Sequence, residues 1–179
     1  VSPAAKPGDV RVKDLNGPHG KPDGVINSTY DRTIIGRTTP DWYGGWRNTF
    51  SYKGLELTVL LETVQGVLKY NGYYGSLQGR DNQVKVNYWT PTNPSNEFPQ
   101  PDRNNGDYRY RTASTVRDAS FVALRNVSLT YNLPSSLFTK VPVKGLSVYV
   151  RGNNLKYWTD YKDAYSPEVN AYRFPTVKT

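Results

Sequence analysis

The sequence contains no cysteine and no methionine, and its single histidine, His19, lies in a stretch rich in glycine and proline. Without cysteine, the chain has no disulfides, thiolate nucleophiles or cysteine-ligated zinc clusters. One histidine also argues against catalytic triads and multi-histidine metal sites. Long apolar runs are absent too: none approaches the ~20 residues of a membrane-spanning helix, whereas the strands of a membrane barrel carry a much weaker signal.

Clustered positive charge is also missing. The formal net charge is +8, but Lys and Arg stand singly, with acidic residues between them. Proteins that bind nucleic acids gather their basic residues on one face, so we expect no nucleic-acid partner. We also expect no enzyme activity. Glu56 and Glu62 lie about 20 Å apart on one expected strand, at ~3.4 Å per residue, which is too far for the carboxylate pair of a glycosidase.

The composition that is present favours an all-β, turn-rich chain, with 13 prolines, 15 glycines and 15 tyrosines. Its strongest pattern covers residues 48–65, where apolar and polar side chains alternate on both sides of Lys53 and Gly54. This pair predicts a very tight hairpin turn, because glycine supplies a positive φ at no steric cost. Leu60 and Val64 fall on the polar side, so the alternation is imperfect.

The same period of two returns in residues 121–134 and 146–155, which predicts a second pair of strands. Each strand would have one apolar and one polar face. In a membrane barrel the apolar face would contact lipid. The residues assigned to that face are Phe50, Leu57, Val59, Leu61, Val127, Leu129, Tyr131, Val148 and Val150.

Long connections are expected at one end of these strands and short ones at the other. Outer-membrane barrels have short periplasmic turns and long outer loops, whereas a soluble sandwich spreads its long loops less systematically. A soluble carbohydrate-binding β-sandwich is the alternative, with aromatic side chains as its sugar platform.

Two aromatic regions bear on this choice. Trp42 and Tyr43, just before the hairpin, suit either an interfacial girdle or a sugar-binding face. Residues 66–120 lack a clean period, and a stretch of this length tends to be functional. Its candidates for contact with carbohydrate or peptide are Trp89, Arg103, Tyr108 and Tyr110, although a loop packed on its own aromatics explains them equally well.

Oxygen-bearing side chains gather in residues 14–31. Asp14, Asn16, Asp23 and Asp31 have a spacing similar to that of a calcium loop, but PHGKP interrupts the strict motif. Turns closed by Asp and Asn side chains would hold the same loop without metal. The sequence therefore leaves a structural calcium and a metal-free loop both open.

Eight segments in succession strengthen the barrel interpretation. They are GDVRVKDLNG (8–17), DGVIN (23–27), DRTIIG (31–36), NTFSYKGLELTVLLE (48–62), NYWTPTNP (87–94), ALRNVSLTYNLP (123–134), LSVYVRGNNL (146–155) and YSPEVN (165–170). Together they resemble the C-terminal part of the SusC/RagA-type TonB-dependent outer-membrane transporters of Bacteroidetes. The family loop reads DLNGDGVID without interruption, so the insertion here bears on any metal site.

The resemblance implies a fold, a function and partners. It implies the C-terminal strands of a large antiparallel transmembrane barrel of about 22 strands with long extracellular loops. Residues 1–179 would then be a partial barrel domain, without the plug, the earlier strands and the final strand. We expect the chain to be an excerpt of a longer protein.

The implied activity is import of oligomeric nutrients, glycans or peptides, across the outer membrane of a Gram-negative bacterium. The implied partners are a SusD-like surface lipoprotein, outer-membrane lipid and the TonB complex, the last through an N-terminal region. No cofactor is required beyond the possible calcium. The candidates for contact with the ligand or the lipoprotein lid are Trp42, Tyr43, Trp89, Arg103, Tyr108 and Tyr110.

Overall fold

The computed structural model describes residues 6–70, 86–100, 113–140, 142, 145–161 and 166–169. The chain divides into two compact units, one of residues 1–36 with 70–117 and the other of residues 37–69 with 118–179. Within the described ranges, no helix is long and apolar enough to cross a membrane.

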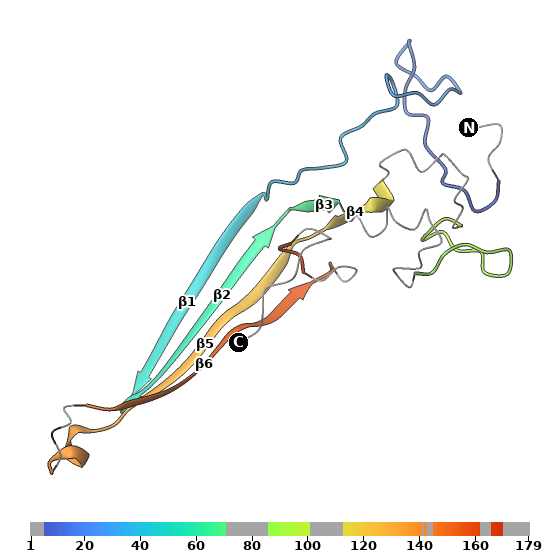
Figure 1. The fold of residues 1–179 in the computed structure, drawn as a ribbon. Helices are drawn as coiled ribbons and strands as arrows, with labels where there is room; N and C mark the ends of the chain where they lie inside the picture. Colours follow the sequence, from blue (N-terminus) through green and yellow to red (C-terminus); the bar gives the residue numbers. More distant parts are fainter. Residues whose placement is uncertain are drawn as a thin grey trace. The chain divides into compact units, whose positions relative to one another are not determined.

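The second unit is built on one four-stranded antiparallel sheet (Figure 1). Its strands, in spatial order, are β1 (Trp42–Tyr52), β2 (Leu55–Gln65), β5 (Phe121–Asn132) and β6 (Ser147–Thr159). Two short strands, β3 (Leu68–Tyr70) and β4 (Val116–Asp118), form a separate two-stranded sheet. Single 3₁₀ turns occur at Ala113–Thr115 and Ser135–Phe138.

A two-residue turn joins β1 to β2, as the sequence predicted. Tyr52 pairs with Leu55, and the intervening Lys53 and Gly54 have φ angles of +46° and +84°. Positive φ at both positions defines a type I′ turn, whose twist matches that of the flanking strands. The strong alternation and this turn together fix the register of the hairpin.

The register gathers the predicted apolar residues on one face, which we call the outer face. Residues paired across an antiparallel sheet lie on the same side. One row across the four strands is Phe50, Leu57, Leu129 and Val150, and its neighbour is Tyr52, Leu55, Tyr131 and Val148. Many of these side chains are open, with Phe50 58% and Val150 66% exposed. The residues assigned to the lipid face thus share one face of the sheet, and contact of this face with lipid stays a prediction.

A β-bulge shifts the register between the two halves of the sheet. Leu60 and Leu61 of β2 pair with Asn126 and Leu124 of β5, which leaves Arg125 as an extra residue. On β6 the same step skips two residues, the first of which, Asn154, has φ +51°. An extra residue reverses the phase of alternation. Leu124 therefore follows Val127 on the outer face, and Arg125 lies on the opposite, inner face.

The inner face is covered near the ends of β2 and β6. Val67, Ala119 and Tyr161 form a small core, with Val64 packed against it. This packing explains why Val64 breaks the sequence alternation. The strand β6 also runs further than the predicted segment 146–155, because it continues through Trp158 to Thr159.

Candidate functional site

The candidate site is the four-stranded sheet itself, whose two faces differ in chemistry. The outer face carries aromatic side chains towards both strand ends. Trp42, Trp46 and Trp158 lie at one end, and Tyr52 and Tyr131 at the other. Ten positions separate Trp42 from Tyr52. At ~3.3 Å per residue and a tilt of about 40°, they span about 25 Å of height, which is the thickness of the apolar band of a membrane barrel.

The inner face is polar, and its side chains bond across strands. The hydroxyl oxygens of Thr49 and Thr58 lie 3.1 Å apart, and Asn126 Nδ2 donates to Asn153 Oδ1 at 2.8 Å. Such a surface suits a water-filled or protein-filled lumen rather than a second packed sheet.

Arg125 is the centre of an ionic cluster on this inner face. Its Nε donates to Glu62 Oε2 at 2.6 Å, and its Nη1 donates to the Tyr157 hydroxyl at 2.6 Å. Both terminal nitrogens donate to the Glu168 carboxylate, with 2.9 Å between Nη1 and Oε2. Asn154 Oδ1 accepts a weaker bond at 3.3 Å. The cluster thus joins β2, β5, β6 and the segment that follows β6.

Residues 166–169 are held against this face by more than Arg125. The Tyr157 hydroxyl also donates to Glu168, and Lys69 Nζ donates to the carbonyl oxygen of Pro167. The hydrogen bond from Arg125 keeps the pKa of Glu168 below its ordinary value. Burial lowers the pKa of Lys69, although the nearby Glu168 charge opposes that shift.

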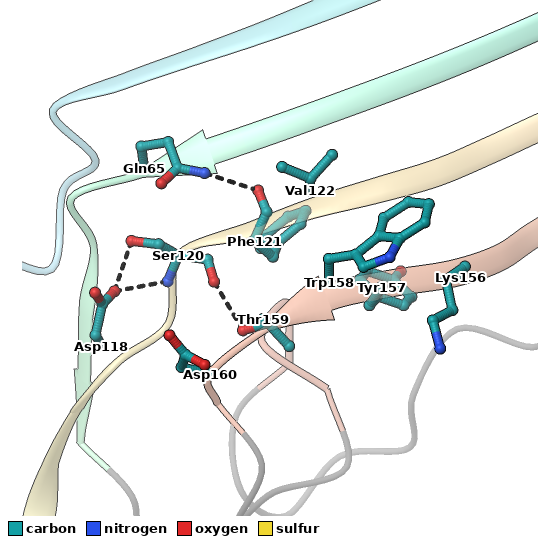
Figure 2. Close-up of a pocket in the computed structure, with 10 residues that line it drawn as sticks. All are labelled: Gln65, Asp118, Ser120, Phe121, Val122, Lys156, Tyr157, Trp158, Thr159 and Asp160. Carbon is teal, nitrogen blue, oxygen red and sulfur yellow. Dashed lines mark hydrogen bonds between the residues drawn. The ribbon is translucent and has the colours of Figure 1, made fainter.

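A cavity of about 590 Å³ lies at the adjoining end of the sheet (Figure 2). Its polar groups are largely bonded to one another. Gln65 Nε2 donates to the carbonyl oxygen of Phe121, and Thr159 Oγ1 donates to that of Ser120. Asp118 accepts from both the backbone and the hydroxyl of Ser120. These hydrogen bonds link the ends of the strands to one another, so we assign no ligand to this cavity.

The predicted contact residues are divided between the two units and the part of the chain outside the described ranges. Trp42 and Tyr43 are successive residues of β1 and lie on opposite faces; Tyr43 is 83% exposed. Trp89 is half-buried in the other unit and packs so closely on Gly8 that a Cβ there would lie 2.5 Å from its ring. Three further candidates, Arg103, Tyr108 and Tyr110, lie outside the described residues.

The loop of residues 14–31 is closed by its own carboxylates. Asp31 accepts from the backbone of Leu15, Asn16 and Asn27, and these bonds lower its pKa. Asp14 Oδ2 accepts from Gly24 at 2.6 Å, whereas Asp14 Oδ1 is buried without a hydrogen-bond partner. In the part of the chain that the structure describes, no three His, Cys, Asp or Glu side chains converge as a metal site.

The insertion in this loop is looped out. Gly20 N donates to Gly17 O at 3.0 Å, which closes a turn. A Cβ on Gly17 would lie within 2.9 Å of the Lys21 carbonyl and the Asp23 side chain, so Asp23 returns next to Gly17. The insertion therefore leaves Gly17 and Asp23 next to each other.

Comparison with known proteins identifies relatives of the chain. The chain is 35% identical over 95% of its length to TonB-dependent receptor P3 of Formosa agariphila, and 31% identical over 87% to receptor P26 of the same organism. It aligns with a structure of the RagAB peptide importer in its closed-closed state with a TM-score of 0.70, at 27% identity over 90% of this chain and 19% of that one. The chain is homologous to TonB-dependent receptors, and its solved neighbours are RagAB importers. No family model matches it.

The chain spans 16% of the length of each of these curated relatives. The prediction of antiparallel barrel strands is confirmed, since its solved neighbours have that fold. Its relatives are receptors and importers rather than enzymes. The sandwich alternative would bury Leu129 and Val150 under a second sheet, but they are 42% and 66% exposed.

Sequence reasoning missed the ionic cluster of this receptor sheet. A strict period of two puts Arg125 on the same side as Val127 and Leu129. The available signal was the charge of Arg125 among apolar residues. An arginine that faces lipid is costly, so its presence in this row indicates a bulge that turns it inward.

Proposed function

We propose that this chain forms part of the wall of an outer-membrane importer in a Gram-negative bacterium, which takes up oligomeric nutrients in a TonB-dependent manner. The observation that carries the proposal is the outer face: rows of exposed apolar side chains between aromatic belts about 25 Å apart. Its strands of 11 to 13 residues are long enough to cross the bilayer at a tilt.

We propose peptides or glycans as the substrate class and a SusD-like surface lipoprotein as the lid. The solved neighbours are named as a peptide importer, which favours peptides. The long connection between β2 and β5 would lie at the outer mouth, because the two-residue turn of the hairpin marks the periplasmic end. Trp89 and the other predicted aromatic contacts would line the ligand entrance or the lid interface.

The structural calcium remains a proposal, with a partial fit. The buried, unpartnered Asp14 Oδ1 lies beside Asp31, and two carboxylates with amide and carbonyl oxygens suit calcium. The loop would gain order from the ion. We expect calcium to raise the melting temperature of the full-length protein, and Asp14→Asn to remove that increase. An equal increase in both proteins would count against this site.

The direct test of the import function is deletion of residues 87–111 from the full-length transporter. We expect the protein to remain in the detergent-extractable outer-membrane fraction while uptake of labelled peptides or oligosaccharides falls and the lipoprotein no longer co-purifies. Replacing the turn residues 135–138 with a glycine-serine linker is the matched control at the opposite strand ends. Normal uptake and an intact complex after the deletion would overturn the role of the loop.

A further inference from the structure

The Arg125 cluster fastens a segment that is distant in sequence. Four acceptor groups, on Glu62, Asn154, Tyr157 and Glu168, surround the guanidinium, whose side chain is only 15% exposed. A planar guanidinium that grips a carboxylate with two nitrogens fixes both distance and orientation. Since every side of the group is occupied, Arg125 is not a free binding site for solute. Its geometry suits the positioning of Glu168.

The fastened segment lies against the inner face, since Glu168 bonds to Arg125 and Tyr157. Ser166 is 4% exposed, and the inner-face residues Phe121 and Ala123 of β5 are 5% and 1% exposed. Further along the strands the inner face is partly open, since Tyr149 is 67% exposed and Ser128 is 8% exposed. The hydrogen bonds of residues 167 and 168 to Lys69, Arg125 and Tyr157 lie at the end of the sheet that holds the long connections. Lys69 adds a second attachment through the Pro167 carbonyl.

We propose that residues 166–169 form a strap that Arg125 fastens to the lumen wall, and that this strap borders the path of the solute. The proposal rests on the proposed function only in taking the inner face as the lumen. A strap held by charge-assisted bonds on this mostly polar wall narrows the lumen at one height. Loss of the Glu168 carboxylate would release it, while the sheet keeps its backbone pairing and the bond between Arg125 and Glu62.

The strap is tested by cysteine labelling in the full-length transporter, with other cysteines replaced. Ser166→Cys places a thiol at a buried position, which should react slowly with a maleimide. Adding Glu168→Ala should raise the labelling rate at least about tenfold, because hydrogen bonds to a charged group shift the equilibrium between the fastened and the released strap by about that factor. Glu56→Ala is the matched control: Glu56 also lies on the inner face of β2, and among the described residues it makes no ion pair.

The labelling rate of purified protein in detergent measures only the exposure of residue 166. The result therefore does not depend on whether the protein imports nutrients. An unchanged labelling rate in Glu168→Ala would overturn the strap. Arg125→Lys should give an intermediate rate, because an ammonium cannot grip the carboxylate with two nitrogens. The second readout is the concentration dependence of peptide uptake by cells. Glu168→Ala should change the peptide concentration that gives half-maximal uptake at least about twofold, and Glu56→Ala should not. Equal uptake curves for wild type and Glu168→Ala would overturn the role of the strap in the solute path.

Discussion

At Gly54 the backbone has φ +84°, and a Cβ atom would lie 2.7 Å from the carbonyl oxygen of Asn132. Both the turn conformation and the close approach of β5 thus require glycine at this position. Gly145, at the start of the strand region of β6, has open space around it and an ordinary φ. The two glycines allow a matched comparison within one sheet.

We expect Gly54→Ala to destabilise the folded barrel by more than ~1 kcal/mol, because alanine is strained at positive φ and its methyl group meets a backbone carbonyl. Gly145→Ala should be neutral or slightly stabilising. Urea unfolding of the full-length protein in detergent, followed by heat-modifiable mobility, measures both. Equal midpoints for the two variants would contradict the type I′ turn.

The charges around Glu168 give a pH dependence. Arg125, Tyr157 and Lys69 face this carboxylate, and Glu62 shares the guanidinium. Its folded pKa is depressed below the ordinary 4.5, so its contribution to stability is complete above pH 4.5 and is lost as pH falls through the folded pKa. The melting temperature of the wild type should therefore fall more steeply below pH 4.5 than the melting temperature of Glu168→Gln. Parallel curves would show that the pair contributes nothing.

At the scale of the elements, neighbouring residues of β2 allow the outer and inner faces to be compared directly. Val59 lies on the outer face and Thr58 on the inner one. A charge on the lipid face near the midplane costs ~2–4 kcal/mol. We expect Val59→Arg to reduce the fraction of folded barrel in outer membranes far more than Thr58→Arg does. Similar losses for both variants would show that the faces are assigned wrongly.

The strands were predictable to the extent that their side chains alternate. Residues 48–65 predicted the hairpin and its turn, because the alternation of side chains and the position of the glycine both indicate the same register. The last residues of β6, 156–159, were missed, because Asn154 and its neighbour form a bulge that interrupts the period before Trp158. The partner of Arg125 could not be read from sequence, since Glu168 approaches it only through the fold of the segment after β6.

At the scale of the whole molecule, the account depends on which side of the sheet meets lipid. The four strands offer one face of apolar rows and belts and one face of polar pairs with an ionic cluster. The lumen strap follows from this orientation, because it lies on the inner face. Homology supports the barrel, and the faces of this particular sheet can be measured independently of transport.

The most direct measurement is a nitroxide scan along β2 of the full-length protein in lipid, from Glu56 to Leu61, with accessibility to oxygen and to a water-soluble nickel complex. Labels at Leu57, Val59 and Leu61 should favour oxygen, and those at Glu56 and Thr58 should favour nickel, with a period of two. Leu60 should follow the inner face despite its apolar side chain. A scan without this period, or with the two reagents exchanged, would contradict the outer face as the lipid surface.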